Sequence, residues 1–69
     1  MYRYIAYFTD APDLVATLKT HPSHMYAAPS YLAIYLPSID RAVMVPCNTE
    51  GRDSDECEVI LRDALASLN

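Results

Sequence analysis

Residues 31–36 read Tyr31-Leu32-Ala33-Ile34-Tyr35-Leu36, and this alternating stretch decides the fold. Leucine and isoleucine alternate with tyrosine and alanine, as side chains do on the two faces of a β-strand. Pro37-Ser38-Ile39-Asp40 then has the composition of a turn, and residues 41–47 return as a second apolar strand. The sequence therefore predicts an antiparallel hairpin over residues 31–47.

The segments on either side of the hairpin predict one further strand and two helices. Residues 2–8 are rich in aromatic and β-branched side chains, which is typical of a strand. Asp10 as N-cap and Pro12 in the first turn predict a helix start, and Pro22 ends the apolar stripe that follows. Near the C-terminus, apolar residues recur at helical spacing, with capping signals at Asp53 or Asp55: Cys57, Ile60, Leu61, Ala64, Leu65 and Leu68. Residues 24–28 fit a short additional strand.

The order of elements is β-α-β-β-α, and it predicts a single α+β domain over residues 1–69. We expect a small two-layer domain, with an antiparallel sheet of three to four strands and both helices on one face. This order resembles a ferredoxin-like fold without its last strand. The resemblance concerns the order of elements and implies no function.

Composition excludes several classes of function. The 69 residues carry nine acidic and five basic side chains, a formal net charge of -4, which argues against direct binding to nucleic acid or anionic membranes. A single glycine excludes glycine-rich phosphate loops and dinucleotide fingerprints. The N-terminus lacks a signal-peptide pattern, no run of 18 apolar residues occurs, and only two cysteines are present. We therefore expect a cytoplasmic protein that does not enter the membrane.

The excess negative charge is concentrated in residues 50–58. Five acidic residues lie there with Arg52 as the one basic residue, so this segment holds four net negative charges: Glu50, Asp53, Asp55, Glu56 and Glu58. Capping of the last helix explains one or two of these carboxylates. The remainder form a candidate surface that binds a basic site on a partner protein, as phosphates would. A calcium loop is disfavoured, because the other spaced ligands and the required glycine are missing.

Six of the seven aromatic residues are tyrosines. If both helices cover the leucine and isoleucine face of the hairpin, Tyr31 and Tyr35 lie on an open sheet face, beside Tyr2 and Tyr4 of the first strand. Exposed tyrosines are enriched at protein interfaces, so this face predicts either a homodimer or a contact with another protein. Cross-strand packing on a half-exposed sheet is the simpler interpretation. Base stacking is disfavoured, because too few basic residues are present to hold phosphates.

The remaining reactive side chains predict no cofactor, metal or catalytic site. Cys47 and Cys57 could approach each other, and the sequence leaves open whether they pair. His21 and His24 lack the paired Cys-x-x-Cys units of strong zinc sites. Ser23 lies beside His24 without a third orienting group, and 69 residues leave little wall for a substrate pocket, so we expect no enzymatic activity.

In size, acidity and lack of a catalytic motif, the chain is similar to the small inhibitors that phages encode against host defences, such as anti-CRISPR proteins that mimic nucleic acid. This likeness implies a non-enzymatic inhibitor or adaptor that docks its acidic surface on a nucleic-acid-binding site of a partner protein, as a monomer or a homodimer. An antitoxin that neutralises a basic toxin has the same profile. A ferredoxin-like regulatory module that binds a small ligand is a further alternative.

Overall fold

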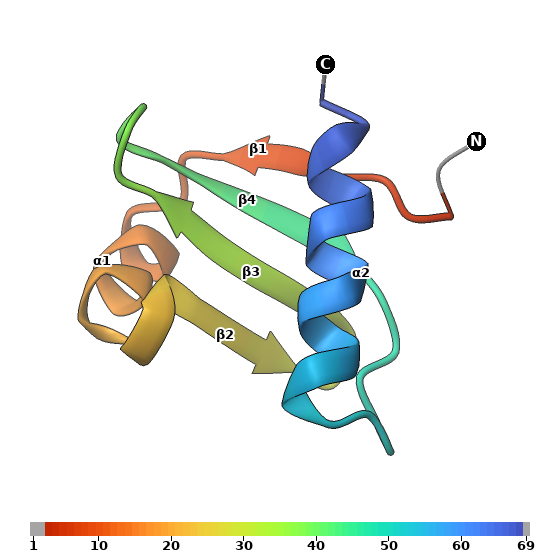
Figure 1. Cartoon of the computed structure of the whole chain (residues 1–69). Coiled ribbons are helices and arrows are strands. Elements are labelled where there is room, and N and C mark those ends of the chain that lie inside the picture. Colours follow the sequence, from red (N-terminus) through yellow and green to blue (C-terminus); the bar gives the residue numbers. More distant parts are fainter. Residues whose placement is uncertain (1–2, 69) are drawn as a thin grey trace.

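The four strands form one antiparallel sheet in the computed structural model, which describes residues 3–68 (Figure 1). The strands are β1 (Tyr7–Thr9), β2 (Met25–Ala28), β3 (Tyr31–Leu36) and β4 (Arg41–Pro46), in the spatial order β1-β4-β3-β2. The predicted hairpin is confirmed as β3 and β4, with Leu36 opposite Arg41 beside the turn. The additional strand is confirmed as β2, which pairs with β3 and forms one edge. The α+β class and the antiparallel sheet are therefore as the sequence predicts.

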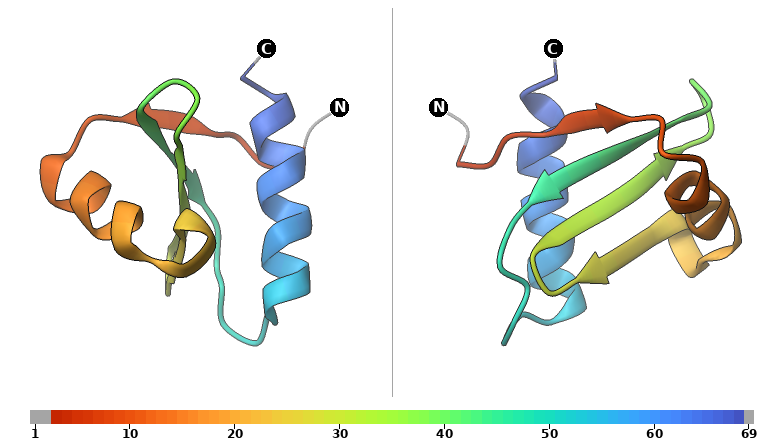
Figure 2. Two further views of the ribbon diagram at one scale, coloured as in Figure 1. Left: turned by 60° about the vertical axis from the view of Figure 1, so that its left-hand side comes forward. Right: turned by 180° about the vertical axis from the view of Figure 1, so that it is seen from behind.

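Three helical segments accompany the sheet: α1 (Pro12–Thr20), the short 3₁₀ segment η1 (Pro22–His24) and α2 (Ser54–Ala66). Figure 2 shows α1 and α2 on opposite faces of the sheet. The expectation that both helices share one face is therefore wrong, and the domain has three layers instead of two. The one-faced arrangement implied by the ferredoxin-like resemblance is not formed. No helix among residues 3–68 is long and apolar enough to cross a membrane.

The reason for two covered faces lies in the alternation of β3 and β4. On one face, Leu32, Val43 and Val45 pack against the apolar stripe of α2, which comprises Cys57, Ile60, Leu61 and Ala64. On the other face, Leu18 of α1 packs with Tyr35 and with two small residues, Ala33 and Ala42. Leu18, Ala33 and Ala42 have no exposed surface. The two alanines let the helix approach the sheet closely, so the tyrosine and alanine face is a second core.

Two local predictions at the N-terminal end are also corrected. β1 begins at Tyr7, because the preceding segment turns towards α2: the backbone amides of Arg3 and Tyr4 donate to Asp63 Oδ2 at 3.0 and 3.2 Å. Pairing with β4 is therefore limited to three residues. The N-cap of α1 is Ala11, not Asp10, and it has no side-chain cap. Pro12 at the first position still presets the backbone for a helix start.

Candidate partner-binding surfaces

Residues 50–58 form the loop before α2 and its first turn, and some of their carboxylates make hydrogen bonds or ion pairs within the domain. The Asp53 carboxylate accepts a hydrogen bond from the Glu56 amide at 2.8 Å, which confirms Asp53 as the N-cap. Glu56 pairs with Arg52 at 3.7 Å, and Glu58 pairs with Arg62 at 2.6 Å one turn later. All five predicted acidic residues are exposed. Helix capping and surface ion pairs therefore account for three of the five carboxylates.

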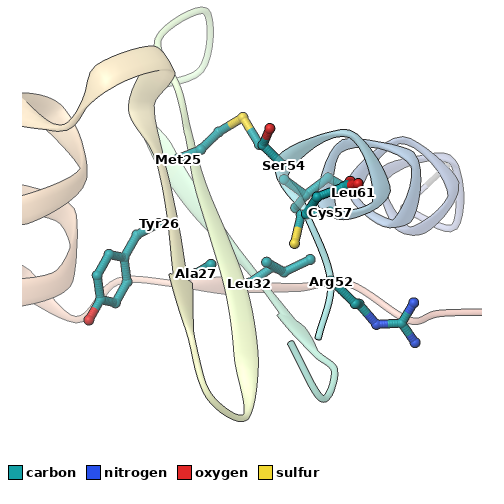
Figure 3. Close-up of a pocket in the computed structure, with 9 residues that line it drawn as sticks. Met25, Tyr26, Ala27, Leu32, Arg52, Ser54, Cys57 and Leu61 are labelled. Atoms are coloured by element: carbon teal, nitrogen blue, oxygen red, sulfur yellow. The ribbon is translucent and has the colours of Figure 1, made fainter. Parts of the chain in front are cut away.

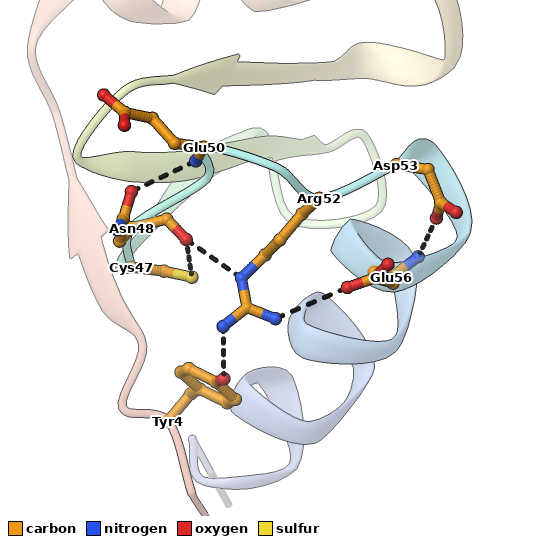
Figure 4. Close-up of polar contacts among 7 residues, drawn as sticks. All are labelled: Tyr4, Cys47, Asn48, Glu50, Arg52, Asp53 and Glu56. Carbon is orange, nitrogen blue, oxygen red and sulfur yellow. Dashed lines mark hydrogen bonds and ion pairs between the residues drawn. The ribbon is translucent and has the colours of Figure 1, made fainter.

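Arg52, the single basic residue of this segment, points towards Tyr4 and Glu56 (Figure 4). Its Nε donates to the Asn48 carbonyl at 2.9 Å, and its Nη2 donates to the Tyr4 hydroxyl at 3.5 Å. The chain reverses just before it at Gly51, whose φ of 75° lies in the left-handed region that favours glycine. Arg52 thus ties the loop after β4 to the N-terminal segment and to Glu56 of α2. The Arg52 guanidinium therefore already has hydrogen-bond and ion-pair partners within the chain.

The two remaining carboxylates, Glu50 and Asp55, are exposed to solvent. Glu50 and Asp55 form no ion pair with the residues that the structure describes. Asp55 and Glu58 line one shallow depression with Arg62, whereas Glu56 lines another with Tyr4 and Asp63. The five residues therefore form a collar around the start of α2, which we call the acidic collar (Glu50, Asp53, Asp55, Glu56 and Glu58).

An apolar groove of about 300 Å³ adjoins the acidic collar, between β2 and the first turns of α2 (Figure 3). Its lining comprises residues of β2, β3 and the start of α2: Met25, Tyr26, Ala27, Leu32, Arg52, Asp53, Ser54, Cys57 and Leu61. No signal in the sequence locates this groove, because it arises only where the edge strand β2 and α2 come together.

Both cysteines are free thiols that pack on the α2 side of the sheet. Cys57, on the inner face of α2, is buried in the core, and Cys47 packs against the same core. Burial raises the pKa of the Cys57 thiol, and the nearby Cys47 raises it further. Cys57 is therefore a protonated core residue at neutral pH, since a thiol needs a lowered pKa to be reactive.

The four predicted tyrosines do not form one face. Tyr35 is buried under α1, and its hydroxyl donates to Asp40 Oδ1. Tyr31 is half-buried on the same side, and Tyr4 packs against the core on the α2 side. Tyr2 lies outside the described residues. The sequence did not identify Tyr7 and Tyr26 as surface tyrosines, although they are 55% and 36% exposed.

The two histidines pack against aromatic rings. The ring centroid of His21 lies 5.2 Å from that of Tyr26, and His24 lies 5.6 Å from Tyr35. His24 Nδ1 is also 3.3 Å from the Leu18 carbonyl. Within residues 3–68, no three side chains of the metal-binding types come together. The histidines thus join η1 to the side of the sheet that α1 covers.

Comparisons with models of protein families, with curated protein sequences and with solved structures found no match to this chain. The candidate surfaces therefore rest on the geometry described above.

Proposed function

We propose that this chain is a non-enzymatic inhibitor or adaptor that docks its acidic collar on a basic, nucleic-acid-binding site of a partner protein. The observation that carries the proposal is the exposure of Glu50 and Asp55, which form no ion pair with described residues. Neither carboxylate caps α2, although Asp55 lies in its first turn, where a negative charge favours the helix dipole. The two nearby cations already have partners within the chain, since Arg52 contacts Asn48, Tyr4 and Glu56 and Arg62 pairs with Glu58.

The apolar groove supports a protein partner over a purely electrostatic contact. Stable interfaces combine buried apolar anchors with a polar rim. Here the groove, lined by Met25, Leu32 and Leu61, adjoins the acidic collar at Asp53. A basic partner with one protruding apolar side chain fits both features. An anti-defence inhibitor of the anti-CRISPR type and an antitoxin both meet this description, and the partner's own activity separates them.

A small-ligand regulatory module is the second candidate, and the groove is the observation that favours it. Its volume of about 300 Å³ is at the lower end of ordinary ligand pockets. A ligand there would be apolar and uncharged or cationic, because the neighbouring carboxylates disfavour an anion. Substitution of Ala27, an exposed residue of the groove lining, by Trp would fill the groove and abolish such binding, while the charge variants below would retain it.

The proposal is tested by reversing these two charges of the acidic collar, as Glu50→Lys with Asp55→Lys. The matched control is Asp10→Lys with Asp13→Lys, which makes the same change in net charge beside α1. Proteins captured from a host lysate by the wild-type chain should be lost with the first variant and kept with the second. Capture should also fall as salt rises and on addition of duplex DNA, since the partner site binds phosphates. Equal capture by both variants contradicts the proposal.

A further inference from the structure

The strand β2 forms one edge of the sheet (Figure 1). It pairs with β3 alone, and no strand among residues 3–68 lies beyond it. Edge strands are commonly protected from further pairing by charged side chains, proline or a bulge. β2 reads Met25-Tyr26-Ala27-Ala28, pairs without a bulge and contains none of these residues. Tyr26 and Ala27 are exposed, so this edge is free to accept another strand.

The hydrogen bonds of β3 show in which direction its backbone groups point. The Cys47 amide, just after β4, donates to the Ser30 carbonyl, just before β3, at 3.1 Å. The backbone of Ser30 therefore faces β4. Because backbone groups alternate in direction along a strand, those of Tyr31 and Ala33 face the other neighbour of β3, which is β2.

The pairing register extends this alternation to β2. The two residues of β2 that lie opposite these positions are Tyr26 and Ala28, so their backbone groups bond to β3. The backbone groups of Met25 and Ala27 therefore face away from the sheet. The Met25 amide already donates to the Pro22 carbonyl of η1. The outward groups that remain for an added strand are the C=O of Met25 and both the N–H and the C=O of Ala27.

The apolar groove reaches this row of backbone groups. Three consecutive residues of β2 line the groove, although neighbouring side chains of a strand point to opposite faces. Figure 3 shows the side chain of Tyr26 pointing away from α2, so Tyr26 lines the groove through its backbone. A strand added to β2 therefore lies along the groove.

The geometry of such an added strand determines which of its side chains enters the groove. In an antiparallel pair, the residue opposite Ala27 exchanges two backbone hydrogen bonds with it. Directly opposite side chains share a face, and Ala27 itself lies opposite Leu32, which packs in the core under α2. The partner side chain opposite Ala27 therefore points towards α2. An apolar side chain fits there, beside Met25, Leu32 and Leu61.

The charge around the groove favours basic residues on the added strand. Asp53 lines the groove and is exposed, and two further carboxylates of the acidic collar, Glu50 and Asp55, lie close to it in the chain. Arg52 is the one cation of the lining, and it is already paired with Glu56. Side chains two residues before and after the apolar one lie on the same face of the added strand. Lysine or arginine at these positions therefore meets a negative surface.

We propose that the partner of the acidic collar presents an extended segment that adds to β2, with an apolar side chain in the groove and a basic residue two positions away. This inference rests on the proposed function and states which kind of segment the partner presents. In this mode of recognition, backbone hydrogen bonds provide affinity, and pockets for alternate side chains provide specificity. A partner segment is favoured over a second copy, because β2 itself has no basic residue and two copies carry like charge.

A capped synthetic peptide, Thr-Lys-Thr-Leu-Thr-Lys-Thr, tests strand addition on the full chain. Its leucine and lysines lie on one face of a strand and its threonines on the other. Amide hydrogen exchange measured by NMR is the readout. Saturating peptide should slow exchange of the Ala27 amide severalfold, whereas the Tyr26 amide, which already bonds to β3, should change less. An Ala27 amide that exchanges at the same rate up to millimolar peptide overturns the proposal.

N-methylation of the peptide provides matched controls. A methyl group on the leucine nitrogen removes the N–H that the Ala27 carbonyl accepts, and should weaken binding by about tenfold or more. The same methyl group on the adjacent threonine faces solvent and should leave the affinity unchanged. Equal effects at the two positions overturn backbone pairing. Glutamate in place of both lysines should also weaken binding, and equal affinity contradicts the basic character of the segment.

Two further measurements separate this inference from its alternatives. If the Ala27 amide becomes protected in the free chain as protein concentration rises, a second copy occupies the edge and the proposal is wrong. Ala27→Pro removes an outward N–H at an edge position, where proline is tolerated, so the variant should fold by circular dichroism and lose partner capture from the lysate. The peptide measurements use the wild-type chain and do not depend on the folding of this variant.

Capture by the variants distinguishes failure of this inference from failure of the proposed function. If the charge reversal at Glu50 and Asp55 abolishes capture and Ala27→Pro retains it, strand addition is wrong and the acidic collar remains the docking surface. If the charge reversal retains capture, the proposed function fails, and the segment inferred from it fails as well. Loss of capture in both variants supports the two proposals together.

Discussion

At the scale of single residues, Tyr35 and Asp40 join three parts of the domain. The Tyr35 hydroxyl of β3 donates to Asp40 Oδ1 in the turn before β4, and Lys19 Nζ of α1 lies 3.8 Å from the same oxygen. Lys19 also lies over the Tyr35 ring, 5.4 Å from its centroid. Asp40 has a φ of 52°, a left-handed conformation that aspartate tolerates better than most residues. One buried tyrosine thus links the turn to the helix that covers the sheet.

Titration of this pair should be visible in the stability of the domain. The hydrogen bond from Tyr35 and the charge of Lys19 lower the pKa of Asp40 below its ordinary value of 3.8. The hydrogen bond to Asp40 raises the pKa of Tyr35 above 10.0. A lowered carboxyl pKa contributes stability above pH 3.8 that is lost as pH falls through the folded value, and a raised tyrosine pKa contributes stability that is lost as pH rises above 10.0.

We therefore predict that Tyr35→Phe lowers the free energy of unfolding at neutral pH, and that its deficit shrinks as pH falls below 3.8 and through the lowered pKa of Asp40. Urea unfolding of both proteins at neutral pH and at a series of pH values below 3.8 measures the difference. Tyr7→Phe is the control, because Tyr7 is 55% exposed on the edge strand and should show little change. A deficit that is independent of pH would mean that the lost hydroxyl, and not its bond to Asp40, causes the effect.

At the scale of the elements, the two helices depend on different cores. α2 contributes a stripe of four buried residues, whereas Leu18 is the one fully buried side chain of α1. The sequence predicted α2, with its cap at Asp53, because its period and capping signals agree. It also predicted both helices, the hairpin and the short β2. The sequence placed α1 on the wrong face. Tyr31, Ala33 and Tyr35 are compatible with an exposed sheet face, but they also fit a core in which a helix packs on small residues.

Leu18→Ala should therefore destabilise the domain by about 2–5 kcal/mol, since it leaves a cavity between α1 and the sheet. That loss is a large fraction of the total stability of a small domain, about 5 kcal/mol or somewhat more. The midpoint of urea unfolding and the helical signal in circular dichroism measure it. Val59→Ala, at an exposed position of α2, should change stability by less than about 0.5 kcal/mol. Equal effects of the two substitutions would show that α1 is not docked on the sheet.

At the scale of the whole molecule, the excess negative charge lies on one side of the sheet. The acidic collar surrounds the start of α2, whereas α1 and its small core lie on the other face of the sheet. A partner that binds the acidic collar therefore approaches the domain from the α2 side.

The sequence by itself determined the antiparallel hairpin, the cap and apolar stripe of α2, and the location of the four excess negative charges in residues 50–58. These features depend on residues close together in the chain, whose periodicity and capping chemistry act locally. The tertiary structure decided the layer of α1, the contact of Arg52 with Tyr4, and the apolar groove. Each of these depends on which distant surfaces fit together, and Ala33 and Ala42 decide that fit through the space that their side chains leave for Leu18.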